Sequence, residues 1–129
     1  MEIEIFTICD SAHAYNNKLV IVGTFNQITS NQFPMVYPSF TIVGRICYED
    51  IEGGPKTYEL SFLDPDGNNV VPKIKWNAEV NIEPKKNAYI NFNINLNQIQ
   101  LGKVGTYNIN LKSEGINRTF KLFVTEKNR

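Results

Sequence analysis

The stretch Ile90-Asn91-Phe92-Asn93-Ile94-Asn95-Leu96-Asn97 decides the fold class, because apolar and polar side chains alternate strictly along it. Successive side chains of a β-strand point to opposite faces, so this alternation predicts a strand with one buried face and one solvated face. The runs that alternate in the same way are Phe40–Glu49, Thr57–Phe62, Asn77–Glu83 and Thr106–Lys112. One solvated face per strand is typical of antiparallel sheets. We interpret the four asparagines as residues that fill solvent-facing positions, with a specialised asparagine ladder as the alternative.

Four further segments complete the predicted strands. They are Glu2–Cys9, Lys18–Ile28, Val70–Trp76 and Arg118–Glu126. In the first, Ile3 and Ile5 share one parity while Phe6 and Ile8 share the other, which predicts a β-bulge or a change of sheet. Pro72 has no N–H to donate to a ladder, so its segment should be an edge strand.

Turn residues and one tyrosine narrow the topology. Asp64-Pro65-Asp66-Gly67 and Ser113-Glu114-Gly115 are typical of turns between antiparallel strands. Gly105-x-Tyr107-x-Ile109 begins a late strand just after a corner, where immunoglobulin-like domains place a tyrosine that bonds to upstream backbone. We therefore predict one domain over residues 1–129, an all-β, antiparallel β-sandwich of about nine strands with immunoglobulin-like topology. A jelly roll and a flattened barrel are the alternatives.

Charge and hydropathy exclude several classes of protein. The 129 residues carry 13 basic and 13 acidic side chains, whereas nucleic-acid binders and proteins of anionic membranes have an excess of Lys and Arg. We therefore expect neither partner. There are three basic and eight acidic residues in residues 1–64, against ten and five in residues 65–129. If the strands of the two halves segregate in space rather than interleave, this division favours self-association. No signal peptide or long apolar run is present, so we expect a cytoplasmic location and reduced thiols at Cys9 and Cys47.

Several short motifs together carry a family resemblance. They are Phe6-Thr-Ile-Cys-Asp10, Asn17-Lys-Leu-Val-Ile-Val-Gly-Thr-Phe25, Phe33-Pro34, Tyr37-Pro38 and the late Gly105-x-Tyr107. The chain resembles, over nearly its whole length, an uncharacterised family of small bacterial β-sandwich proteins known only as a domain of unknown function. The resemblance implies a β-sandwich fold and a bacterial, cytoplasmic protein, and it implies no activity.

No combination of residues makes a complete catalytic or metal site. Cys9, His13 and Asp10 would need a tight loop to act as a nucleophile, base and orienting group, in that order. One His and two distant Cys residues cannot supply the ligand spacing of a zinc site. Asp64 and Asp66 alternate like calcium ligands, but a hairpin turn explains them better. We therefore expect a protein that is not an enzyme and needs no cofactor.

An apolar connection is the most unusual segment of the chain. Gln32–Ser39 contains Phe33, Met35 and Tyr37 where a loop would ordinarily be polar. Such a segment either plugs one end of the sandwich with Phe33 and Val36 or presents a rigid contact surface. Trp76 has the same two readings, as a plate between the sheets or as the wall of a groove beside Pro72.

These observations predict a non-catalytic protein-binding or assembly module that contacts a protein partner or a second copy of itself. The contact residues would be Phe33, Met35, Tyr37 and Trp76. The alternative is a small-ligand-binding β-sandwich with its site at one end, near Phe33, Tyr37 and Trp76. A small hydrolase that uses Cys9 or the carboxylates is a third hypothesis.

Overall fold

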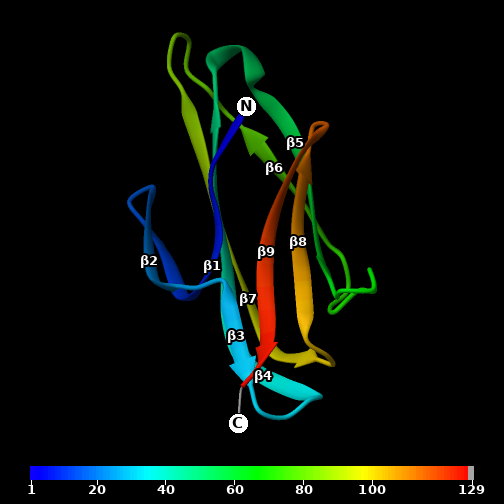
Figure 1. The fold of residues 1–129 in the computed structure, drawn as a ribbon. Coiled ribbons are helices and arrows are strands. Elements are labelled where there is room, and N and C mark those ends of the chain that lie inside the picture. The colour runs from blue at the N-terminus through cyan, green and yellow to red at the C-terminus, as the bar shows by residue number, and fades with distance from the viewer. Residues whose placement is uncertain (128–129) are drawn as a thin grey trace.

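The computed structural model describes residues 1–127 and places nine strands in two facing sheets (Figure 1). The strands are β1 (Glu2–Tyr15), β2 (Lys18–Thr24), β3 (Gln27–Ser30), β4 (Met35–Tyr48), β5 (Gly54–Leu63), β6 (Ile74–Val80), β7 (Ala88–Leu101), β8 (Gly105–Ser113) and β9 (Ile116–Glu126), with one 3-10 turn at Asp50–Glu52. The four-stranded sheet has the order β2-β1-β4-β7, and the five-stranded sheet has the order β3-β9-β8-β5-β6. The all-β, two-sheet prediction is therefore confirmed.

The core lies between the sheets and follows the alternation of the sequence. Ile8 and Ile42 of the four-stranded sheet face Leu60 and Ile109 of the five-stranded sheet, and all four are fully buried in one cluster. Burying such a side chain contributes about 1.5–3 kcal/mol, so this cluster supplies the main driving force for closing the two sheets. Within residues 1–127, no helix is long and apolar enough to span a membrane.

The strand boundaries differ from the sequence prediction in several places. The predicted strand Lys18–Ile28 is divided into β2 and β3, because the chain crosses from one sheet to the other after Thr24. Parts of the predicted strands Val70–Trp76 and Asn77–Glu83 form the single strand β6 (Ile74–Val80), which begins after Pro72 and is an edge strand as Pro72 indicated. The expectation of purely antiparallel pairing is wrong for one pair, since β3 runs parallel to β9. A strand that crosses between sheets is not joined to its new neighbour by a hairpin, so it can pair with that neighbour in parallel.

The first strand is longer than predicted and folds back on itself. The predicted β-bulge is present as a register shift between Ile3 and Ile5. The strand then continues to Tyr15 and turns into β2 through Asn16 and Asn17, both with positive φ. Asparagine tolerates this left-handed conformation, which a two-residue hairpin turn requires.

The β1–β2 hairpin curls over the outer face of its sheet and makes that sheet a half-barrel. Asn93 Nδ2 donates to the Ala12 carbonyl at 3.0 Å, and Asn91 Nδ2 donates to the Asn17 carbonyl at 3.1 Å. A second small core of Cys9, Ala12 and Val43 is buried underneath the hairpin. Asn93 is exposed and Asn91 is half-buried, as the solvent-facing interpretation expects, but both side chains also bind the hairpin backbone. The alternation places Val43 on the face of its strand that we expected to be solvated. Val43 is instead fully buried, because the hairpin covers it.

The expected tyrosine corner is present. The Tyr107 hydroxyl donates to the Lys103 carbonyl at 2.8 Å and also accepts a bond from the Lys103 N–H at 3.4 Å. Tyr107 is buried, and its ring lies edge-on to Phe62 at a centroid distance of 6.1 Å. This bond joins the end of the β7–β8 connection to the core and fixes where β8 begins.

Candidate functional site

One long side of the sandwich is open, because β6 and β7 are the edge strands of their sheets there. An apolar hollow of about 430 Å³ lies between these two strands. Its apolar walls are Ile74, Trp76 and Ala78 from β6 and Ile90, Phe92 and Ile94 from β7. All of these side chains except buried Phe92 are half-buried, although they point toward the core side of their strands. The core is thus only partly covered along this side.

Trp76 forms the centre of this hollow and is held from two directions. Its ring stacks on Tyr58 of β5 at a centroid distance of 5.2 Å and an interplanar angle of 21°. It also lies 5.3 Å from the ring of Phe92, across the gap between the sheets. Tyr58 is itself buried and its hydroxyl is hydrogen-bonded, so the tryptophan rests on a rigid support. Aromatic side chains fixed in this way lose little entropy on binding. Both sequence readings of Trp76 therefore describe part of its position, as an interior plate and as a groove wall.

The outward face of β6 is polar and charged. Lys75, Asn77 and Glu79 alternate with the inward apolar residues, and all three are exposed. In the ladder with β5, Lys75 lies opposite Glu59, whereas Glu79 lies opposite Pro55. The ion pairs formed within residues 1–127 include neither Lys75 nor Glu79. The edge strand therefore carries one exposed charge of each sign outside these ion pairs, symmetrically placed about Asn77, although the Lys75 charge also acts on Glu59 across the ladder.

The apolar segment near residue 35 is not a loop beyond its first residues. Strand β4 begins at Met35, and Tyr37 pairs with Ile99 of β7. Phe33, Met35 and Tyr37 are half-buried and pack against the main core. Val36 points outward and is 51% exposed, so the expectation that it helps to plug the sandwich is wrong. The strand alternation begins earlier than the two prolines suggested. It buries every second residue of the segment.

The structure does not bring Tyr37 and Trp76 to one end of the sandwich. Tyr37 packs against Phe25 with ring centroids 6.0 Å apart, while Trp76 lies against Phe92. Phe92 and Ile99, the β7 neighbours of Trp76 and Tyr37, are seven residues apart in the sequence. That separation corresponds to about 23 Å of extended strand. Tyr37 instead lines a separate hollow of about 390 Å³ with Asp10 and Phe25.

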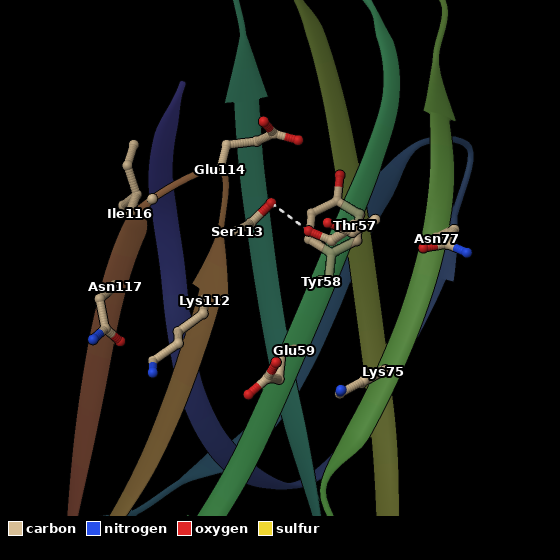
Figure 2. A pocket seen from close by; sticks show the side chains of 11 residues that line it. Thr57, Tyr58, Glu59, Lys75, Asn77, Lys112, Ser113, Glu114, Ile116 and Asn117 are labelled. Atoms are coloured by element: carbon tan, nitrogen blue, oxygen red, sulfur yellow. Dashed lines mark hydrogen bonds between the residues drawn. The ribbon is translucent and has the colours of Figure 1, made fainter.

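A larger polar hollow of about 590 Å³ lies on the outer face of the five-stranded sheet (Figure 2). Its floor includes a row of side chains across four strands, in the order Asn117, Lys112, Glu59 and Lys75. Figure 2 shows Glu59 between the two lysines, and its carboxylate is paired with Lys73 Nζ at 2.8 Å. The hydrogen bond from Lys73, together with Lys75 and Lys112, lowers the pKa of Glu59. The charges of this hollow are therefore largely neutralised within the chain.

The residues considered for catalysis lie apart or are engaged elsewhere. Cys9 is fully buried, and its thiol donates to the backbone carbonyls of Ser11 and Thr41 at 3.3 and 3.7 Å. Burial raises the pKa of this thiol, which opposes its use as a nucleophile. His13 is exposed on the hairpin. No group of three or more His, Cys, Asp or Glu residues that could hold a metal ion occurs within residues 1–127.

The turn that resembled a calcium loop is satisfied by its own backbone. Asp64 Oδ1 accepts hydrogen bonds from the N–H groups of Asp66 and Asn68, both at 2.9 Å. Gly67 has a φ of +84° and its N–H donates to the Asp64 carbonyl at 3.0 Å. The hairpin interpretation of this segment is confirmed.

The comparison with protein families gives a match over almost the whole chain. A family model described as a family of unknown function, DUF6941, matches residues 4–124. The chain belongs to this family. The matched range begins inside β1 and ends inside β9, so the DUF6941 model spans both sheets, the hairpin and the open side at β6 and β7. No curated protein matches the chain.

Proposed function

We propose that this DUF6941 chain is a non-catalytic protein-binding or assembly module whose contact surface is the open side of the sandwich. The observation that carries the proposal is Trp76, a rigidly supported aromatic ring in the apolar hollow between two edge strands. Aromatic residues in apolar pockets are the usual energetic centres of protein interfaces. An unpaired strand edge beside them offers backbone hydrogen bonds to an added strand.

Photo-crosslinking tests this proposal without knowledge of the partner. The photoreactive residue p-benzoylphenylalanine replaces Asn77 on β6 or, as the control, Lys121 on β9, both of which are exposed. In the native cell we expect a crosslinked adduct of higher mass from position 77 and none from position 121. An absence of adduct at position 77, with the variant folded and expressed, would contradict the proposal.

A small-ligand site remains a second candidate, and it rests on the hollow beside Tyr37. Asp10 and Tyr37 both line that hollow, and they place a carboxylate and a phenol next to the ring of Phe25. A ligand that binds only the native state must raise the melting temperature. We expect any stabilising metabolite or sugar found in a thermal-shift panel to lose its effect in the Tyr37→Ala variant. A panel without a stabilising compound would count against this candidate.

For the topology, we propose the immunoglobulin-like arrangement expected from the sequence. Three features support it: the tyrosine corner at Tyr107, the parallel pairing of β3 with β9, and the strand order β9-β8-β5-β6. In this arrangement the β1–β2 hairpin is an insertion between two parts of the first strand, each of which pairs with a different sheet.

A further inference from the structure

We propose that the partner of the open side is a second copy of this chain, and that the two β6 strands pair antiparallel about a two-fold axis at Asn77. This inference rests on the proposed function, because it names the partner of the same surface. The two five-stranded sheets would then form one continuous sheet, with two Trp76 hollows near the axis. A closed two-fold contact of this kind uses the same patch on both copies.

The sequence of β6 is self-complementary in this register. An axis at Asn77 places Lys75 opposite Glu79 of the second copy, and the symmetry repeats this pair. Each pair joins two exposed charges that have no ion-pair partner within residues 1–127 of their own chain. Asn77 is also the midpoint of β6, so all residues from Ile74 to Val80 find a partner.

The inward-facing residues fit the same register. Trp76 would lie opposite Ala78 of the second copy, so a large side chain meets a small one on the face that carries the apolar hollow. An axis at Trp76 would place the two indole rings directly against each other and would separate Lys75 from Glu79. An axis at Ala78 would place Asn77 opposite Glu79. The charges and the side-chain sizes both favour the axis at Asn77.

The self-complementary charges provide a sharp experiment on the purified full chain. Sedimentation equilibrium over a concentration series measures the dimer dissociation constant of the wild type and of three variants. Lys75→Glu and Glu79→Lys each place like charges opposite one another twice, and we expect each to weaken the dimer by about tenfold or more. The double variant Lys75→Glu/Glu79→Lys restores opposite charges and should return close to the wild-type constant. An equimolar mixture of the two single variants should form a mixed dimer.

A disulfide test checks the register directly. Position 77 would face itself across the axis at a Cα separation that a disulfide can span. Asn77→Cys should therefore give a covalent dimer on mild oxidation, in a Cys47→Ser background. The matched control is Lys73→Cys, since the two copies of position 73 would lie about 26 Å apart along the paired strands.

The outcomes separate this inference from the proposed function. A wild-type chain that stays monomeric up to millimolar concentration, or single variants with unchanged dimerisation, would overturn the self-pairing. If position 77 then still crosslinked to a protein of different mass in the cell, the open side would be a docking edge for that other protein. The absence of both a dimer and an adduct would overturn both proposals. Circular dichroism of each variant shows whether the fold is retained.

Discussion

The hydroxyl oxygens of Tyr48 and Tyr58 lie 2.7 Å apart in the interior and join the two sheets. Tyr48 comes from β4 and Tyr58 from β5, and they are 1% and 2% exposed. Tyr58 also carries the stacked ring of Trp76. One buried hydrogen bond thus connects the four-stranded sheet to the support of the candidate contact residue.

Removing one of these hydroxyls should destabilise the protein. Tyr48→Phe leaves the Tyr58 hydroxyl without this partner in a buried position, which costs about 1–3 kcal/mol. We expect the double variant with Tyr58→Phe to lose less than the sum of the two single losses, because it leaves no orphaned hydroxyl of the pair. Urea denaturation of the wild type, the two single variants and the double variant measures this coupling. Strictly additive losses would show that the bond contributes nothing.

The same pair predicts a loss of stability at alkaline pH. Burial is the main cause that raises the pKa of both tyrosines. The hydrogen bond between them raises the pKa of Tyr48 further and partly offsets the rise at Tyr58. An unfolded chain releases the tyrosine proton near about pH 10, while the native state retains it to higher pH. The free energy of unfolding should therefore be unaffected by these groups below about pH 9 and should fall as the pH rises above about 10.

Denaturation curves at intervals between pH 8 and 11 measure this slope. Because Tyr48→Phe removes one of the two shifted groups, its stability should decrease less steeply with pH than that of the wild type. An identical slope in both chains would contradict the assignment to this pair. Other buried groups, such as Cys9, are retained in both chains and cancel in the comparison.

The asparagine bond to the hairpin should be measurable in the same way. Asn93→Ala removes the hydrogen bond to the Ala12 carbonyl, and we expect a loss of about 1 kcal/mol together with faster amide exchange in β2. The matched control is Asn97→Ala, because Asn97 is exposed on the same face of β7 and forms no side-chain hydrogen bond to residues 1–127. Equal effects of the two substitutions would show that the hairpin does not depend on this bond.

The sequence predicted those parts of the fold that depend on local alternation. The strands at Phe40–Glu49 and Ile90–Asn97, the turn at Asp64–Gly67 and the bulge near Ile3 all lie where period-two patterns and turn residues place them. The curl of the β1–β2 hairpin could not be predicted, because it depends on bonds from Asn93 to a backbone carbonyl 81 residues away. No local pattern carries that information.

The candidate site also combines features that local sequence predicts with features that depend on distant residues. Trp76 was found from its residue type and from the neighbouring proline, and its position on an edge strand agrees with both. The alternation in β7 indicates only that its neighbour Phe92 belongs to the core, because the gap between β6 and β7 depends on the order of strands in both sheets. Phe33, Met35 and Tyr37 pack against the core instead, because the strand pairing of β4 extends to Met35.

A last prediction concerns the close contact behind the open side. Gly44 lies opposite Phe92 in the β4–β7 ladder, and a Cβ added at residue 44 would collide with the Phe92 ring. Gly44→Ala should therefore push that ring toward Trp76 and cost about 1–3 kcal/mol through overpacking. Trp76 is the only tryptophan, so its fluorescence reports the displacement while urea denaturation reports the loss of stability. Gly102→Ala is the matched control, since no atom lies within 4 Å of its added Cβ. We expect Phe92→Leu to restore part of the stability of Gly44→Ala by making room at the collision. If Gly44→Ala leaves both the fluorescence and the stability unchanged, then Phe92 does not form the rigid wall of the hollow, and the preorganised surface around Trp76 loses one of its two supports.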